Sequence, residues 1–512
     1  MPHTFFAQIL KRAFAQAIKK DAQTFDKGRR DFVRNTSFAI GGTALSKTAA
    51  FLPFFSKNEK SIAIIGGGMA GLNAAWHLKK NNLKATIYEA SGRTGGRMFT
   101  LKNKFGEGAI TDIGGEFVDA THEDIIALMK EFGLPLYDLR EDSLEQKLFY
   151  FGGKRFTQAD LRSAIQPFAE RIAKDAKSFP EIINYRFAAS FLHLDNLSIT
   201  EYLENIGITG WLYDFINIVL TREYGMEASE QSAVNFLIMF VAPDTNIKKY
   251  ELFGNTHEVL KIKGGSQHLT DCLSEKLKDQ IKTGHRLVAI KKDGKIGYKL
   301  HFNYGNEEKI IKADFVLLAI PFTILRKINF DVPMPAAKRK CIDELGYGNS
   351  CKFIMGFDKR MWRSAGFQGY TFSDIGIGAG WDSTQMQLID GGSFTVFDGG
   401  ISGDNMKTSA IEILRDKYLT TLDIIYPGTG STYRKNNLKY CWSNSPFVKA
   451  GYSAFKKGQW STLAGWEGEP VGNIFFAGEH VSREFQGYMN GAAETGRKAA
   501  EAIMQQVNIN MS

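Results

Sequence analysis

The chain has 512 residues, of which 44% are hydrophobic and 23% are charged, a balance typical of globular proteins. At about 150 residues per domain, this length predicts roughly three domain-sized units. The formal net charge of +9 is concentrated in residues 1–60, where 11 basic and 4 acidic residues give +7 and leave +2 for the rest. A basic balance confined to one end is not that of a nucleic-acid-binding surface, so no nucleic-acid partner is expected.

The four cysteines lie at positions 272, 341, 351 and 441. They form no C-x-x-C pair, and no histidines lie nearby at metal-ligand spacing. A core of this size needs no disulfide to hold it. We therefore expect four free thiols and no metal site.

Residues 1–58 are predicted to form a leader. The sequence of residues 28–34, Gly-Arg-Arg-Asp-Phe-Val-Arg, resembles a twin-arginine export motif. The apolar stretch that follows is interrupted by Lys47 and is too polar for a stable membrane span. This pattern favours export to the periplasm or outside the cell. The alternative is an amphipathic helix over residues 4–20, in which case the protein would stay in the cytoplasm.

A nucleotide-binding fingerprint begins directly after the leader. Residues 61–65 are an isoleucine-rich run typical of a buried parallel strand. They lead into Gly66-Gly67-Gly68-Met69-Ala70-Gly71, which satisfies G-x-G-x-x-G and opens a predicted helix. The N-terminus of such a helix carries unpaired N–H groups and a positive dipole end that favour phosphates.

Each glycine of the G-x-G-x-x-G sequence has a physical role. Gly66 permits the tight turn, Gly68 allows a pyrophosphate to approach the backbone, and Gly71 allows the helix to pack closely on the strand. A second predicted strand over residues 84–88 ends at Glu89, whose carboxylate is suited to accept hydrogen bonds from a ribose. These features together predict a dinucleotide site.

Arg93-Thr94-Gly95-Gly96-Arg97 follows Glu89 and resembles the second signature of the flavin-containing amine oxidase family, which includes monoamine, polyamine and L-amino-acid oxidases. The resemblance covers residues 61–505 and favours FAD over NAD. It is also carried by Thr111–Phe117, by Gly264-Gly265 with Leu269, by His285–Val288, by Ala313–Pro321, and by residues 473–480 and 487–492.

The resemblance implies an α/β fold in which a Rossmann-like FAD-binding domain is interleaved with an α+β substrate-binding domain. The expected FAD-binding segments are 59–120, 255–330 and 470–505, and the expected substrate-binding segments are 121–254 and 331–469. It implies cofactor contacts by Gly66, Gly68, Met69, Ala70, Gly71, Glu89, Ala90, Arg93, Gly96, Arg97, Gly114, Gly115, Glu116, Val288, Gly478, Glu479, Gly487, Tyr488, Met489 and Ala492.

Three residues are predicted to carry the chemistry. Lys352 matches the family's active-site lysine, which would hold a water near the flavin and assist its reoxidation by oxygen. Tyr452 and Tyr488 match the paired aromatic rings that flank the substrate amine. Members with covalent flavin have a cysteine immediately before the first tyrosine, but this chain has Gly451, so we expect non-covalent FAD.

The resemblance implies a hydride transfer from the carbon beside the amine, hydrolysis of the resulting imine, and release of hydrogen peroxide. We expect an L-amino acid as substrate, with a monoamine or a polyamine as the alternative. Glu116, Arg222, Trp442 and Trp460 are the candidate substrate contacts. Glu116 stands where many L-amino-acid oxidases have an arginine, so Arg222 or another arginine of the substrate-binding domain would have to bind the carboxylate. Alternatively, Glu116 could meet a cationic diamine or polyamine.

Two further interpretations remain open. The chain could be a related FAD-dependent desaturase, or a flavoprotein without catalytic activity that binds a partner. The expected partners are a small amine or amino acid and dioxygen, and a homodimer is left open.

Overall fold

The computed structural model describes residues 60–240 and 259–509. The predicted leader, residues 1–58, lies outside these ranges, so the export motif stays a prediction. Among the described helices, none has both the length and the apolar character needed to cross a bilayer.

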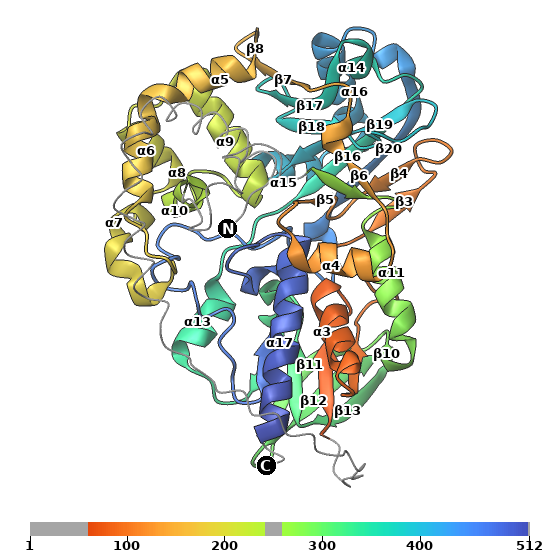
Figure 1. Cartoon of the computed structure of the whole chain (residues 1–512), viewed down its shortest axis with the longest axis vertical. Helices are drawn as coiled ribbons and strands as arrows, with labels where there is room; N and C mark the ends of the chain where they lie inside the picture. Colours follow the sequence, from red (N-terminus) through yellow and green to blue (C-terminus); the bar gives the residue numbers. More distant parts are fainter. Residues whose placement is uncertain (1–59, 241–258, 510–512) are drawn as a thin grey trace, which may run out of the picture.

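The lower part of the molecule in Figure 1 is built on a five-stranded parallel sheet. Its strands, in spatial order, are β10 (Ile281–Lys282), β2 (Ala85–Tyr88), β1 (Ile62–Ile65), β14 (Phe315–Leu318) and β21 (Ile474–Phe476). β1 is buried along its whole length, as its isoleucine-rich sequence predicts. Strands from both ends of the chain therefore share one sheet.

The two faces of this sheet are covered by different elements. Ile62 and Ile64 pack in a core with α3 (Met69–Lys80), α11 (Gln267–Lys276) and α17 (Met489–Ile509). Ala63 and Ile65 point to the other face, because successive strand residues alternate.

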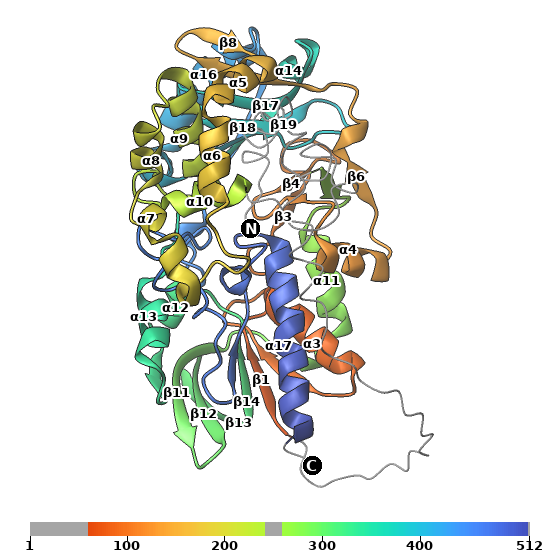
Figure 2. The same cartoon turned by 60° about the vertical axis from the view of Figure 1, so that its left-hand side comes forward.

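That second face is covered by a four-stranded sheet, which Figure 2 shows in green at the base of the molecule. Its order is β13 (Glu307–Ala313), β12 (Gly297–Tyr304), β11 (Arg286–Asp293) and β15 (Asn329–Asp331).

The upper part contains a mixed seven-stranded sheet assembled from two segments of the chain. Its order is β20 (Tyr433–Cys441), β16 (Cys351–Phe357), β19 (Gly392–Asp398), β18 (Ala379–Asp382), β17 (Phe367–Ser373), β7 (Gln146–Phe151) and β8 (Lys154–Phe156). β16 is buried at every position.

Helices flank this sheet. On one side lie α5 (Gln158–Ile165), α6 (Ala169–Ala176), α7 (Leu192–Asp195), α8 (Ile199–Asn205), α9 (Gly210–Tyr224) and α10 (Ala233–Leu237). α14 (Met361–Ser364), α15 (Gly400–Thr408) and α16 (Ile411–Ile425) also belong to the upper part, whereas α12 (Phe322–Leu325) and α13 (Ala336–Glu344) lie beside the lower part. α5 and α8 begin with capping boxes, formed by Thr157 with Asp160 and by Ser198 with Glu201.

The helix that follows the expected boundary at residue 120 packs with the lower part of the molecule. α4 (Glu123–Glu131) buries Ile125, Leu128 and Met129 in the core that also holds Ile62 and Ile64, and Asp124 forms an ion pair with Arg497 of α17. Beside it, β6 (Leu136–Asp138) joins a three-stranded sheet with β9 (Leu260–Ile262) and β5 (Phe117–Val118). A smaller pair, β3 (Thr100–Lys102) and β4 (Ile110–Asp112), completes the strands.

The expectation of four free thiols is wrong for two of them. Cys351 of β16 and Cys441 of β20 lie opposite each other in the antiparallel register, with their Cα atoms 4.1 Å apart, and form a disulfide. They are 90 residues apart in sequence, so only the pairing of the two strands brings them together. Cys272 and Cys341 are free.

Candidate functional site

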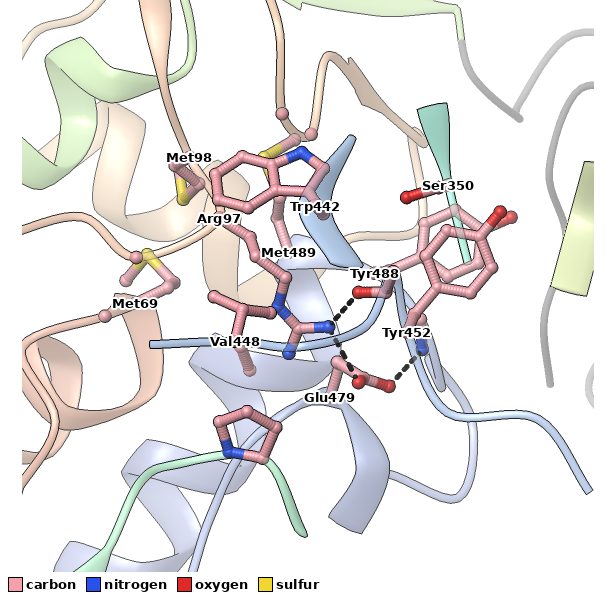
Figure 3. Close-up of a pocket in the computed structure, with 18 of the residues that line it drawn as sticks. Met69, Arg97, Met98, Ser350, Trp442, Val448, Tyr452, Glu479, Tyr488 and Met489 are labelled. Atoms are coloured by element: carbon pink, nitrogen blue, oxygen red, sulfur yellow. Dashed lines mark hydrogen bonds and ion pairs between the residues drawn. The ribbon is translucent and has the colours of Figure 1, made fainter. Parts of the chain in front are cut away.

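A cavity of about 560 Å³ runs between the two parts of the molecule (Figure 3). One end is lined by the glycine turn after β1 and by the beginnings of α3 and α17, and the other end by aromatic side chains of the seven-stranded sheet. Backbone and helix N-termini thus line one end, and rings line the other.

The glycine turn has the geometry that the fingerprint predicts. Gly66 has a φ of +105°, and a Cβ atom there would lie 2.5 Å from the Ala319 carbonyl oxygen. A Cβ atom on Gly71 would lie 2.0 Å from the Gly66 carbonyl oxygen, so only glycine allows α3 to pack this closely on the turn. At Gly68 the nearest neighbour would be the Gly96 Cα at 3.8 Å, which leaves its surface open to the cavity.

Glu89 holds the end of β2 beside this turn. Its carboxylate accepts hydrogen bonds from the Gly67 N–H at 2.7 Å and from the Ser91 N–H at 2.8 Å and hydroxyl at 2.7 Å. Arg93 folds back onto its own loop, donating to the Thr94, Met98 and Gly96 carbonyls with its guanidinium 4.3 Å from the Phe99 ring centre. The loop that carries the second signature is therefore internally braced, and its glycines face the cavity.

Glu479 connects three segments that are distant in sequence (Figure 3). It pairs with Arg97 at 3.0 Å and accepts from the Ser453 hydroxyl at 2.7 Å and from the Gly487 N–H at 3.0 Å. Burial alone would raise the pKa of Glu479, but the Arg97 charge and the hydrogen bonds from Ser453 and Arg97 outweigh it and hold the pKa below its ordinary value. The ionised carboxylate fixes the relative positions of these segments.

Tyr452, Tyr488 and Trp442 form part of the cavity wall (Figure 3). The Tyr452 hydroxyl donates to the Arg222 carbonyl at 2.6 Å, and a Cβ atom on Gly487 would lie 3.8 Å from the Tyr452 ring. The Trp442 indole donates to the Ile113 carbonyl at 3.0 Å. The two hydrogen bonds fix the orientations of the Tyr452 and Trp442 rings.

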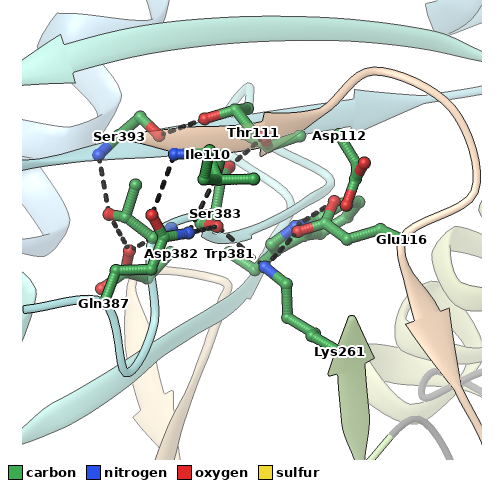
Figure 4. Close-up of polar contacts among 12 residues, drawn as sticks. Ile110, Thr111, Asp112, Glu116, Lys261, Trp381, Asp382, Ser383, Gln387 and Ser393 are labelled. Atoms are coloured by element: carbon green, nitrogen blue, oxygen red, sulfur yellow. Dashed lines mark hydrogen bonds and ion pairs between the residues drawn. The ribbon is translucent and has the colours of Figure 1, made fainter. Parts of the chain in front are cut away.

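Lys352 lies at the start of β16 and is buried at the cavity wall. Its Nζ donates to the Asp112 carbonyl at 2.8 Å, to the Gly114 carbonyl at 3.1 Å and to Glu116 at 2.9 Å. The other oxygen of Glu116 pairs with Lys261 at 2.7 Å (Figure 4). Burial alone would raise the pKa of Glu116, but the two lysines outweigh it and lower the pKa.

Most of the predicted site residues lie around this one cavity. Those that line it are Gly66, Gly68, Met69, Ala70, Glu89, Arg93, Gly96, Arg97, Gly114, Gly115, Glu116, Arg222, Lys352, Trp442, Tyr452, Gly478, Glu479, Gly487, Tyr488, Met489 and Ala492. Four do not line it: Gly71, Ala90, Val288 and Trp460.

Trp460 was expected to contact the substrate, but it does not line the cavity. Its indole donates to the Asn235 side chain at 2.7 Å and its ring lies 4.1 Å from that of Phe455, in the main core. The sequence could not separate the two cases, since a buried tryptophan suits a core as well as a pocket. Val288 lies where the register of β11 on β12 shifts between Leu287 and Ala289, so the pairing skips it.

Arg222 lines the cavity, but its charge is already compensated. Its guanidinium forms a 2.6 Å ion pair with Asp398, and both side chains are buried. The expected role as a binding group for a substrate carboxylate is therefore not supported, because the charge that would recognise a carboxylate is held by Asp398.

Several lining residues were not predicted. Three rings from neighbouring strands, Tyr370, Trp381 and Phe397, form the far wall, and Glu223 and Tyr224 line the cavity from the end of α9. Alternating aromatic residues in a strand are equally typical of a core, so no local signal marked them.

The cavity and the sheet above it define a class of protein. A parallel sheet with a glycine turn, an acid at the end of its second strand and open glycine surfaces along the cavity fits an extended dinucleotide. The second glycine loop and the Glu479 segment extend this surface to an aromatic chamber beside Lys352, as an FAD-dependent oxidoreductase requires.

Comparison with protein families gives the particular assignment. The model of the flavin containing amine oxidoreductases matches residues 69–504, and the chain belongs to this family. Its cofactor is FAD, and it is an oxidoreductase that acts on amines. These findings confirm the predicted family, fold class and cofactor.

Two similar amine oxidases match this chain over most of the length of both proteins. An amine oxidase [flavin-containing] of Danio rerio is 26% identical over 471 residues, covering 87% of this chain and 86% of its own. Amine oxidase [flavin-containing] B of Cavia porcellus is 26% identical over 460 residues, with coverage of 87% and 86%.

Two solved structures share the fold. The cyclohexylamine oxidase of Brevibacterium oxydans superposes with a TM-score of 0.77 at 19% identity, over 88% of this chain and 100% of that chain. A putrescine oxidase bound to putrescine superposes with a TM-score of 0.74 at 21% identity, over 87% and 99%.

Proposed function

We propose that this protein oxidises a small primary amine that carries no carboxylate, with dioxygen as the final electron acceptor. The observation that supports this most directly is that the positively charged side chains of the cavity already have partners within the protein. Each of the four cationic side chains that line it, within the described residues, is engaged by protein acceptors: Arg93, Arg97, Arg222 and Lys352.

This arrangement disfavours the expected L-amino acid. A substrate carboxylate entering a buried site needs a cation or several donors in exchange for its hydration. Arg222 already neutralises the buried Asp398, so a substrate carboxylate that shared it would leave one of the two negative charges uncompensated. A neutral amine with an apolar substituent meets no such cost among Tyr370, Trp381 and Phe397.

FAD, when bound, supplies the hydride acceptor and passes the electrons to dioxygen. The protein's own part is orientation. Tyr452 and Tyr488 present ring faces to the amine, which align its nitrogen and the adjacent carbon. Lys352 supplies a fixed positive charge at the same chamber and would hold the water expected there. Hydrolysis of the imine product and release of hydrogen peroxide complete the proposed reaction.

A diamine is the second candidate, and Glu223 favours it. This buried carboxylate lines the cavity, where it is suited to bind a second ammonium group. Replacing Glu223 with Gln should raise KM for a diamine while leaving KM for a monoamine nearly unchanged.

The direct test is hydrogen peroxide release by the holoenzyme from three substrate groups: benzylamine and cyclohexylamine, putrescine and spermidine, and a set of L-amino acids. We expect the monoamines, or else the diamines, to be oxidised. Rapid oxidation of an L-amino acid alone would refute the proposal, and no peroxide from any amine would favour a desaturase or a non-catalytic flavoprotein.

A further inference from the structure

Three buried charged side chains form a continuous chain that ends at the cavity wall. Glu116 stands in the middle, with one carboxylate oxygen 2.7 Å from the Lys261 Nζ (Figure 4). Its other carboxylate oxygen lies 2.9 Å from the Lys352 Nζ. Each of the three residues is no more than 6% exposed. Glu116 and Lys352 line the cavity, whereas Lys261 lies behind them.

The three residues come from separate elements. Glu116 follows the loop after β4, Lys261 lies on β9, and Lys352 lies on β16 of the seven-stranded sheet. Antiparallel pairing places Lys261 opposite Phe117, the neighbour of Glu116, so the β5–β9 ladder sets the distance between the two side chains. Lys261 is held from its other side by the Ser383 carbonyl at 2.8 Å.

The ion pair between Glu116 and Lys352 is complete without Lys261. Lys261 brings a second buried positive charge beside Glu116 and the neighbouring Asp112 carboxylate. Desolvation makes this unfavourable, and replacing buried ionic groups by apolar ones is often neutral or stabilising. Stability alone gives no reason for Lys261 to be a lysine. What the second lysine does is hold the Glu116 carboxylate in one orientation, aimed at Lys352.

We propose that Lys261 is a positioning residue, which acts through Glu116 to fix the Lys352 ammonium at the reaction chamber. The inference rests on the role proposed above for Lys352. Without Lys261, one oxygen of Glu116 loses its lysine partner, and the carboxylate is held only through its other oxygen, by Lys352 and the Trp381 indole. The Lys352 ammonium keeps its bonds to the Asp112 and Gly114 carbonyls, but its third partner is no longer fixed. A fixed charge stabilises a developing anion because it needs no reorganisation, and a displaced one loses that advantage.

The test compares three lysine-to-methionine variants of the FAD-loaded protein. Lys352→Met removes the charge itself, Lys261→Met removes its support, and Lys263→Met is the matched control, since Lys263 is exposed just past the end of β9. The rate constants for anaerobic flavin reduction by the best amine and for reoxidation by oxygen are measured separately. Sulfite, an anion that adds to oxidised flavin and bleaches it, gives an equilibrium readout that needs no amine.

We expect Lys352→Met to slow reoxidation by about 100-fold and Lys261→Met to slow it by about tenfold. Both variants should bind sulfite more weakly than Lys263→Met, with melting temperatures close to the wild type for Lys261→Met. Lys261→Arg, which restores the charge, should recover most of the lost rate. If Lys261→Met destabilises the protein, Lys261→Gln, which keeps a donor but removes the charge, takes its place, and its reoxidation rate and sulfite affinity are compared with those of Lys263→Met.

Reoxidation and sulfite affinity equal to the Lys263→Met control would overturn the inference, as would losses that merely follow the loss of FAD. If no amine reduces the wild-type flavin, the proposed function fails. The sulfite titration still decides the role of Lys261 in that case.

Discussion

Three buried carboxyl groups of the site differ in how their negative charge is compensated. Glu479 is paired with Arg97 and Glu116 with two lysines. Asp112 instead accepts hydrogen bonds from the Thr100 hydroxyl and from the N–H and hydroxyl of Ser266. Burial, followed by repulsion from Glu116, raises the pKa of Asp112 to about 6.

This difference predicts a specific dependence of stability on pH. Since the pKa of Asp112 is higher in the folded state, the folded protein loses stability from this group as the pH rises from about 4 to about 6, by up to about 3 kcal/mol. In Asp112→Asn that loss is absent, because the amide does not titrate. Urea unfolding at pH 4.5 and pH 7 should show the variant gaining relative to the wild type at the higher pH. A constant difference between the two proteins would contradict the prediction.

At the scale of single elements, the turn between β1 and α3 depends on the absence of side chains. The helix approaches so closely that the Gly71 position has no room for a methyl group. Gly92 lies on the neighbouring loop, with no atom within 4 Å of its Cβ position and no left-handed backbone conformation. The two glycines therefore provide a matched pair.

We predict that Gly71→Ala loses FAD, because the start of α3 must move away from the turn. Gly92→Ala should keep its flavin and lie within about 0.5 kcal/mol of the wild type in stability. The ratio of flavin to protein absorbance in the purified variants measures this. Full flavin occupancy in Gly71→Ala would contradict the assigned role of the helix N-terminus.

The pairing of β16 with β20 is the element that carries the disulfide. Cys351 precedes Lys352 and Cys441 precedes Trp442, so the crosslink lies directly behind two residues of the cavity wall. It holds these two strands in register where the site needs them.

The disulfide makes the thiol count testable. In denaturant without reductant, a thiol reagent should react with two of the four cysteines, Cys272 and Cys341. After reduction, it should react with all four. Cys351→Ser should lower the free energy of unfolding by about 2–4 kcal/mol, because the crosslink restricts the unfolded chain. Four reactive thiols in the unreduced protein would show that the bond does not form.

At the scale of the whole molecule, the two ends of the described chain meet at the cofactor site. α3 and α17 lie side by side in both views (Figures 1 and 2), and the Asn73 side chain donates to the Ala493 carbonyl at 2.7 Å. A Cβ atom on Gly496 would lie 2.3 Å from the Ala70 carbonyl oxygen, so the helices pack without intervening side chains. Residues 66–71 and 478–491, both assigned to cofactor contacts from the sequence, therefore lie at one site.

The same assembly leaves no attachment point for a covalent flavin at Gly451. A Cβ atom there would lie 2.6 Å from the Ser350 hydroxyl oxygen, so the position has no space for a cysteine side chain. We predict that acid precipitation releases all of the yellow chromophore into the supernatant, where its absorbance equals that of the FAD in the intact protein. Colour retained in the washed pellet would contradict non-covalent binding.

The sequence by itself determined the cofactor site, because that site depends on the local backbone. A strand, a glycine turn, a helix start and an acid lie within 28 residues, from Ile62 to Glu89, and their spacing is visible along the chain. The later segments were found by resemblance, and all but a few of the residues expected in them line the cavity.

The tertiary structure alone decided the charge partners and the aromatic wall. Arg222 meets Asp398 across 176 residues, Lys261 meets Glu116 across 145, and Cys351 meets Cys441 across 90. Such pairs form because the tertiary structure brings distant segments together. The role of a charged or aromatic side chain depends on its partner, and the sequence does not show that partner. Trp460 in the core and Trp442 on the cavity wall are the same residue type, and only the packing of the sheets separates them.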